Sequence, residues 1–147
     1  MKAAEIETLL ADAGMYPPEG RGIILHADYA LPTRDWLVAQ FGPAFARNLA
    51  ALRLHYSAEA FNCEGFGRLA WALSLVCYNL AAPPADKAFA TGVMEYKPTS
   101  GLGKGHELFF AITGPRVQDV LFCEAQAALE ETSLTEVERF SCYGYQI

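Results

Sequence analysis

The sequence predicts an α+β fold in which helices fill the first half and a sheet fills the second. Up to about residue 80 the apolar residues recur at helical spacing, and beyond residue 88 they form short β-type runs. A chain of 147 residues that is 52% hydrophobic can bury one substantial core. We therefore expect one domain over 1–147, with a lead-in at 1–27, a helical half at 28–82 and a sheet half at 88–147.

Three helices are expected before the sheet half, the first of them in the lead-in. A pattern over 2–14 places apolar residues on one side and is stopped by Gly14. Thr33 resembles an N-cap for a second helix, which Gly42 and Pro43 should break or kink before it resumes to about residue 54. The third and central helix runs over 62–80, where nearly every side is apolar, and we expect it to be buried on most of its circumference.

The sheet half is expected to be antiparallel. In the run that begins at His106, alternate residues share a face, so Leu108 and Phe110 lie with His106, and Glu107 lies with Phe109 and Ala111. Gly114-Pro115 predicts a hairpin turn, and 97–105 predicts a glycine-rich loop. Residues 22–26 form either a short strand or an extended segment. The predicted strands are 90–96, 106–113, 117–123 and 137–145.

Composition excludes several classes of protein. The formal net charge of -6 argues against sequence-independent binding of nucleic acid, and no apolar run is long enough for a membrane span or an export signal. We therefore expect a cytoplasmic protein with neither nucleic acid nor membrane as a partner. The cysteines occur singly, without a C-x-x-C pair, which predicts reduced thiols and neither cofactor nor metal; they are Cys63, Cys77, Cys123 and Cys142.

Cys63 is the first candidate for chemistry, because it stands where the central helix begins. The unpaired N–H groups and partial positive charge of a helix start stabilise a thiolate. The alternative is that Cys63 is a small buried hydrophobe, as most unpaired cysteines are.

His106 and Glu124 are the candidate partners of Cys63. His106 opens one strand and Glu124 ends the next, so a hairpin turning at Gly114-Pro115 sets them roughly opposite each other. A carboxylate can hold an imidazole in one orientation. The alternatives are an exposed histidine and an exposed glutamate at strand ends. A zinc site made of Cys63, His106 and Glu124 is disfavoured, because close-spaced ligand pairs are absent.

Three short motifs resemble the papain-like fold, in the compact form seen as the C-terminal domain of a fungal agglutinin and in related bacterial and phage-encoded domains. Residues 61–67 read FNCEGFG, 105–107 read GHE and 122–126 read FCEAQ, in the order of that family. The resemblance implies a papain-like cysteine peptidase fold in which Cys63 is the nucleophile, His106 the base and Glu124 the orienting group. Asn62, Gln126 and Asp28 are expected to contact the substrate or the oxyanion.

The resulting prediction is a cysteine hydrolase, a peptidase or amidase, that acts by acyl transfer on a peptide or amide-containing substrate. One alternative is a catalytically inactive papain-like binding module or phage-associated module, located in a virion if the protein is phage-encoded. A third possibility is a structural or inhibitory protein whose acidic surface contacts a basic target.

Overall fold

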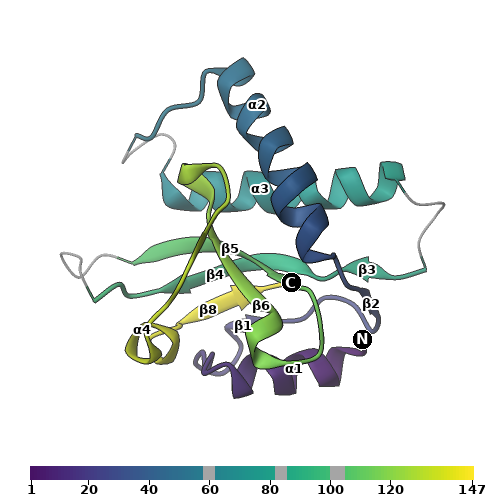
Figure 1. Cartoon of the computed structure of the whole chain (residues 1–147). Coiled ribbons are helices and arrows are strands. Elements are labelled where there is room, and N and C mark those ends of the chain that lie inside the picture. The colour runs from purple at the N-terminus through teal and green to yellow at the C-terminus, as the bar shows by residue number, and fades with distance from the viewer. Residues whose placement is uncertain (58–61, 82–85, 100–104) are drawn as a thin grey trace.

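The computed structural model describes residues 1–57, 62–81, 86–99 and 105–147. It has an α+β architecture in which helices lie on both sides of a six-stranded sheet (Figure 1), as the sequence predicted. Three parts of the predictions lie outside the described residues: Phe61 of the first motif, the Pro83-Pro84-Ala85 segment after the central helix, and 100–104 of the glycine-rich loop.

The main sheet is mixed, whereas the sequence predicted an antiparallel sheet. β1 pairs in parallel with β8, and every other pair of neighbours is antiparallel. A separate parallel pair joins β2 (Tyr29–Ala30) to β3 (Ala88–Phe89). In spatial order the strands of the main sheet are β1 (Gly22–Ile23), β8 (Gly144–Gln146), β4 (Thr91–Tyr96), β5 (His106–Ile112), β6 (Val120–Glu124) and β7 (Glu130–Thr132).

The predicted helices are confirmed. The Thr33 hydroxyl accepts a hydrogen bond from the Trp36 N–H at 3.0 Å, as expected of an N-cap. The expected irregularity at Gly42 is a change from π-helical to α-helical geometry, with Pro43 in the first turn of α2. The helices are α1 (Ala3–Asp12), the π-helix η1 (Trp36–Phe41), α2 (Gly42–Leu52), α3 (Cys63–Ala81) and α4 (Glu136–Phe140), with short 3₁₀ turns η2 (Val117–Asp119) and η3 (Ala125–Ala127).

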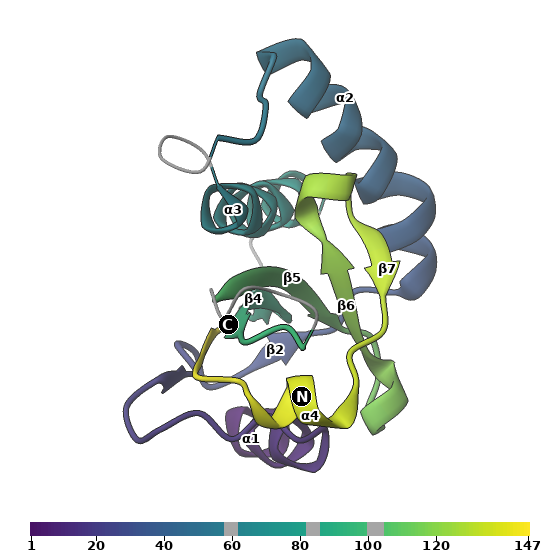
Figure 2. The same cartoon turned by 90° about the vertical axis from the view of Figure 1, so that its left-hand side faces the viewer.

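The sheet separates two apolar cores (Figures 1 and 2). α1 and α4 lie on one face, and α2 and α3 cover the other. β5 contributes to both, because its side chains alternate between the faces as predicted. The α1-side core includes Ile6, Leu10, Met94, Leu108 and Phe110, and the α3-side core includes Leu37, Phe41, Phe45, Phe66 and Phe109.

Three local predictions were wrong. The strand expected over 117–123 begins only at Val120, because 117–119 form η2, whose start is fixed by hydrogen bonds between Arg116 and Asp119. The expected strand over 137–145 is instead α4 followed by β8, because Thr135 and Glu138 form a reciprocal capping box that starts a helix. α3 is buried along one stripe only, and Leu80 on its outer side is 84% exposed. Its apolar circumference had predicted burial on most sides, but the sheet covers a single side of the helix (Figure 2).

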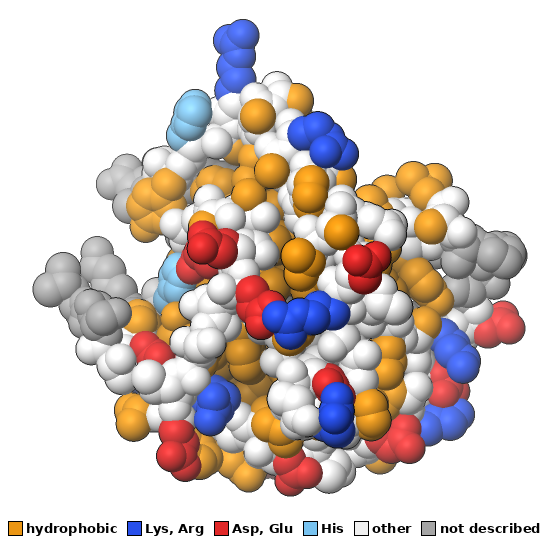
Figure 3. All heavy atoms as spheres, in the orientation of Figure 1, with side chains coloured by type: hydrophobic (Ala, Val, Ile, Leu, Met, Phe, Trp, Pro, Cys, Tyr) orange, Lys and Arg blue, Asp and Glu red, His pale blue; other side chains and the backbone are white. Residues whose placement is uncertain are grey.

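The described part of the chain contains no helix that is both long and apolar enough to cross a membrane. On the face shown in Figure 3, basic side chains are scattered among acidic and apolar ones. This distribution agrees with the acidic composition of the chain.

A buried hydroxyl pair links α3 to the sheet and gives a test of the fold. Ser74 Oγ and Thr91 Oγ1 lie 2.7 Å apart, and both residues are fully buried. Replacing Ser74 with Ala should lower the free energy of unfolding by about 1–3 kcal/mol, because the Thr91 hydroxyl loses its partner. Urea unfolding measures this. Thr8→Ala, which removes an exposed hydroxyl from α1, should cost less than about 0.5 kcal/mol, and an equal effect of both changes would contradict the expectation.

Candidate functional site

The start of α3 is held over the end of β5 by a close contact between Gly67 and Glu107. A Cβ atom on Gly67 would lie 2.5 Å from Glu107 Oε1, so only glycine lets the carboxyl group sit against the helix. This contact places the first turn of α3, which begins with Cys63, above the strand end that carries His106. Helix and strand therefore bring two of the predicted site residues to the same end of the molecule.

His106 and Glu124 form a hydrogen-bonded pair, as their sequence positions predicted. His106 Nε2 lies 2.6 Å from Glu124 Oε2, and both side chains remain partly exposed. Phe109 pairs with Cys123 in the ladder between β5 and β6, so His106 and Glu124 are diagonal neighbours on one face. The other carboxyl oxygen, Glu124 Oε1, accepts a hydrogen bond from the Gln126 N–H at 3.3 Å. Gln126 thus positions Glu124 through its main chain.

Tyr96 completes this end of the sheet. It pairs with His106 across β4 and β5, and the two rings meet edge to face with centroids 5.7 Å apart. Burial raises the pKa of Tyr96 to about 12, and the negative charges of Glu138, Glu124 and Cys63 add to the rise. Cys63 is therefore within electrostatic range of the His106–Glu124 pair, although no hydrogen bond links Cys63 to His106 in the described structure.

Asn62 and Asp28, two further predicted site residues, have partners of their own. Asn62 Oδ1 accepts a hydrogen bond from the Gly65 N–H at 3.3 Å and so caps the start of α3. Asp28 forms an ion pair with Lys2 at 2.7 Å, beside β3. Because β3 precedes the first residue of β4 and His106 pairs with the last, Asp28 lies at the opposite end of the sheet from His106.

The thiols divide into two kinds. Cys123 and Cys142 are buried, and burial raises their pKa values to about 12 and about 11, so both are core residues as predicted. Cys63 is only partly buried and stands at a helix start. Among the described residues, no three His, Cys, Asp or Glu side chains are arranged to hold a metal ion, so the disfavoured zinc site is not formed there.

The His106–Glu124 pair has a defined chemical capacity. An imidazole that donates Nε2–H to a carboxylate keeps its lone pair on Nδ1, which can accept a hydrogen bond or a proton from a bound group. Glu124 holds the ring in orientation, and the Gln126 N–H in turn holds Glu124. The pair is therefore a pre-oriented polar group at an accessible end of the sheet.

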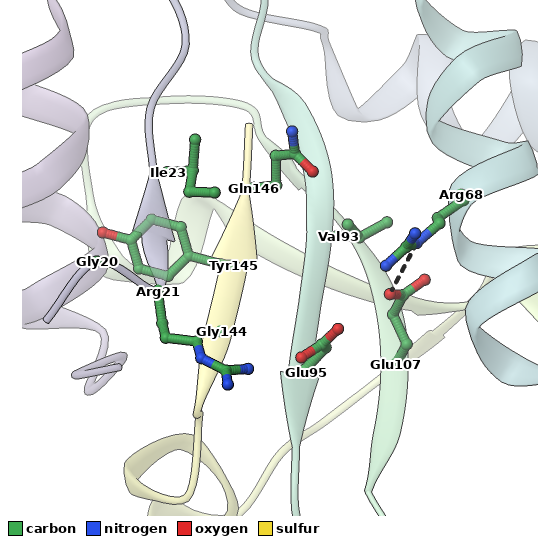
Figure 4. A pocket seen from close by; sticks show the side chains of 10 residues that line it. All are labelled: Gly20, Arg21, Ile23, Arg68, Val93, Glu95, Glu107, Gly144, Tyr145 and Gln146. Atoms are coloured by element: carbon green, nitrogen blue, oxygen red, sulfur yellow. Dashed lines mark ion pairs between the residues drawn. The ribbon is translucent and has the colours of Figure 1, made fainter. Parts of the chain in front are cut away.

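A second polar site lies on the other face of β5, around Glu107. Glu107 is only 3% exposed, and neither of its carboxyl oxygens has a hydrogen-bond partner among the described residues. The side chain borders a cavity of about 190 Å³ between β4, β8 and α3 (Figure 4). The cavity is lined by Gly20, Arg21, Ile23, Arg68, Val93, Glu95, Glu107, Gly144, Tyr145 and Gln146.

The electrostatics of this cavity act against an ionised Glu107. Burial raises the pKa of Glu107 to about 8; Arg68 opposes the rise, and Glu64 and Glu95 add to it. Arg68 Nε lies 3.7 Å from Glu107 Oε2, while the same guanidinium forms a 2.7 Å ion pair with Glu64. Glu107 therefore lacks a close cation of its own.

Glu107 was not predicted as a site residue, although its position in the sequence carried a signal. The alternation of the strand placed Glu107 on the same face as Phe109 and Ala111, which are core residues. A carboxylate at a core position is unusual unless it is paired or functional. A glutamate at a core position of the strand was therefore the sequence signal for this cavity.

No protein-family model matches this sequence, and no curated protein sequence matches it. Two solved structures share its fold over 100% of this chain. The structure titled PSL1a-E64 complex has a TM-score of 0.77 at 16% identity. The Polyporus squamosus lectin bound to the human-type influenza-binding epitope Neu5Aca2-6Galb1-4GlcNAc has a TM-score of 0.73 at 16% identity. The chain covers 51% and 49% of their respective chains, so it spans about half the length of these proteins.

These likenesses correct the prediction of a papain-like cysteine peptidase. One of these two structures is a lectin that holds a glycan and neither is titled as a peptidase, so the predicted hydrolase activity, the peptide or amide substrate and the inactive-peptidase alternative are wrong. The motifs that suggested them are short, and they mark a helix start and two strand ends. An α+β chain of this connectivity provides such features whatever it binds. What the comparisons establish is the fold of this chain.

Replacing Glu107 with Gln should flatten the pH dependence of stability. Glu107 has a pKa of about 8 in the folded protein and an ordinary value of 4.5. Between these values the folded protein retains a proton that the unfolded chain has lost, so the free energy of unfolding falls as the pH rises through this window. At about pH 9 the Gln variant should be more stable than the wild type by on the order of 4–5 kcal/mol, and at about pH 5 the two should agree within about 1 kcal/mol.

Urea unfolding at both pH values measures this effect. Glu136→Gln, which changes an exposed glutamate of α4, is the matched control and should follow the wild type. A Glu107→Gln difference that is the same at both pH values would contradict a buried, proton-holding carboxyl group.

Proposed function

We propose that this chain is a carbohydrate-binding domain. The observation that carries the proposal is the fold shared over the full chain with a lectin whose structure holds the glycan Neu5Aca2-6Galb1-4GlcNAc. Because the chain spans about half of that lectin and shares 16% of its residues, the contacts to a sugar must come from this chain's own polar groups.

The proposed binding surface is the accessible end of the sheet around His106 and Glu124. Sugar hydroxyls both donate and accept hydrogen bonds, and they are best held by planar polar side chains whose orientation is already set. Glu124 sets the orientation of His106, and the Gln126 N–H sets that of Glu124. His106 Nδ1 then accepts from one hydroxyl of the ligand, and the Gln126 side chain offers a donor and an acceptor to a neighbouring hydroxyl.

Cys63 has a place in the same proposal. Its partly buried thiol stands at the start of α3, above the strand end that carries His106. In the proposed complex it borders the ligand together with the His106–Glu124 pair. The grouping of these three residues as one site stays a prediction; the variants below test its His106 and Glu124 members.

His106→Ala should weaken glycan binding about tenfold, because one oriented hydrogen bond to the ligand is worth roughly 1–1.5 kcal/mol. Glu124→Gln should weaken it less, because an amide oxygen can still accept the imidazole N–H. Calorimetric titration of the purified chain with Neu5Acα2-6Galβ1-4GlcNAc measures the affinity, and a glycan array extends the search to other sugars.

His26→Ala is the matched control for His106→Ala, because His26 is exposed and does not belong to the strands that carry His106 and Glu124. It should leave the affinity unchanged. The proposal fails if no glycan on the array binds the folded chain. Unchanged affinity in a folded His106→Ala variant would place the sugar elsewhere on the surface.

A further inference from the structure

The cavity beside Glu107 contains two carboxyl groups that face each other across neighbouring strands. Glu95 pairs with Glu107 in the register of β4 and β5, so both side chains lie on the same face (Figure 4). Like charges directly opposite each other destabilise a sheet. A third carboxylate, Glu64, adds to the negative field at Glu107 from the first turn of α3. This arrangement is unfavourable when both carboxyl groups of the strand pair are ionised, so it is relieved either by a proton on Glu107 or by a positive group that joins the carboxylates.

The arginines of the cavity only partly supply that group. Arg68 reaches Glu107 from α3, but its short ion pair is with Glu64 at 2.7 Å, and its Nε remains 3.7 Å from Glu107 Oε2 (Figure 4). Arg21 lines the cavity with an exposed side chain, and no ion pair joins it to either glutamate in the described structure. Both oxygens of Glu107 therefore remain free to accept hydrogen bonds from a ligand.

The volume of the cavity and the polar groups that line it indicate which class of ligand it can bind. The cavity of about 190 Å³ holds about six water volumes, which suits a small molecule or one end group of a larger one. The described side chains offer no three-residue cluster that could hold a metal ion. A primary ammonium group satisfies carboxylates by hydrogen bonds as well as by charge, since it carries three donors and no acceptor.

We propose that this cavity binds a primary ammonium group of a small amine, which donates hydrogen bonds to the buried carboxyl group of Glu107 and to Glu95. The ammonium adds a cation in hydrogen-bond contact with Glu107, beside Arg68, which Glu107 shares with Glu64. Ile23 and Val93 provide apolar surface for the carbon atoms next to the nitrogen. The site lies on the opposite face of β5 from His106, so it is independent of the proposed glycan contacts.

The charges that face Glu107 make this binding depend on pH. Burial and the carboxylates of Glu64 and Glu95 favour the protonated form of Glu107, with its pKa at about 8, and Arg68 favours the ionised form. A bound ammonium also favours the ionised form. Binding should therefore lower the Glu107 pKa and tighten as the pH rises from about 6 to about 8, by up to tenfold for each pH unit.

Carbon-13 NMR of the labelled protein tests the proposal with ethylamine as the probe and ethanol as its uncharged counterpart. Ethylamine should shift the side-chain carboxyl signals of Glu95 and Glu107 in a saturable manner and should lower the Glu107 midpoint in a pH titration. Ethanol, and sodium chloride at the same ionic strength, should do neither. This titration uses the unmodified chain, so it does not depend on the folding of any variant.

Glu107→Gln should weaken ethylamine binding at least tenfold near pH 8, and Glu136→Gln on α4 should leave it unchanged. Equal shifts with ethanol, a Glu107 midpoint that ethylamine does not move, or full affinity in Glu107→Gln would each overturn the proposal. Glycan binding in the same samples reports separately on the His106 surface.

Discussion

The packing of α3 across β4 and β5 is the contact on which the rest of the structure depends. This packing closes the α3-side core. At two points within it, polar contacts determine where the helix lies on the sheet. At one point the Ser74 and Thr91 hydroxyls bond to each other, and at the other the Glu107 carboxyl group lies against Gly67. Apolar packing alone allows a helix to slide along a sheet, whereas these two contacts determine its position.

The position of α3 in turn determines where the polar groups of both sites lie. His106 and Glu107 are adjacent in the chain and therefore point to opposite faces of β5. His106 joins a hydrogen-bonded pair with Glu124 at an accessible end of the sheet. The buried side chain of Glu107 borders a cavity and has no hydrogen-bond partner among the described residues. The end of β5 thus carries one polar group with a hydrogen-bond partner, His106, and one without a partner among the described residues, Glu107. A ligand that donates hydrogen bonds would stabilise Glu107 more than His106.

Much of the fold could be predicted from the sequence, because local patterns determine it. The helix starts at Thr33 and Cys63 and the His106–Glu124 pair follow from capping and the period of a strand. β5 and β6 do pair as a hairpin, but their connection includes η2 and is longer than the turn predicted at Gly114-Pro115. The parallel partnership of β1 and β8 could not be predicted, since it joins strands from the two ends of the chain. α4 was missed because β-branched and aromatic residues such as Val137, Phe140 and Tyr143 are also common in strands, and the Thr135 capping box decides between helix and strand.

The site was harder to predict than the fold, for a physical reason. A core tolerates exchanges among apolar side chains of similar volume, so a protein with 16% identity can share the fold over the whole of this chain, which is about half of its own length. A binding site has no such tolerance, because each polar group must meet a specific group of the ligand. The short motifs around Cys63 and His106 therefore indicate a helix start and a strand end, and they do not identify the ligand or the reaction. Glu107 is a better indicator of a binding site in this chain, because its carboxyl group occupies a core position and has no hydrogen-bond partner among the described residues. Burying a polar group without a hydrogen bond costs free energy, and a bound ammonium would remove that cost.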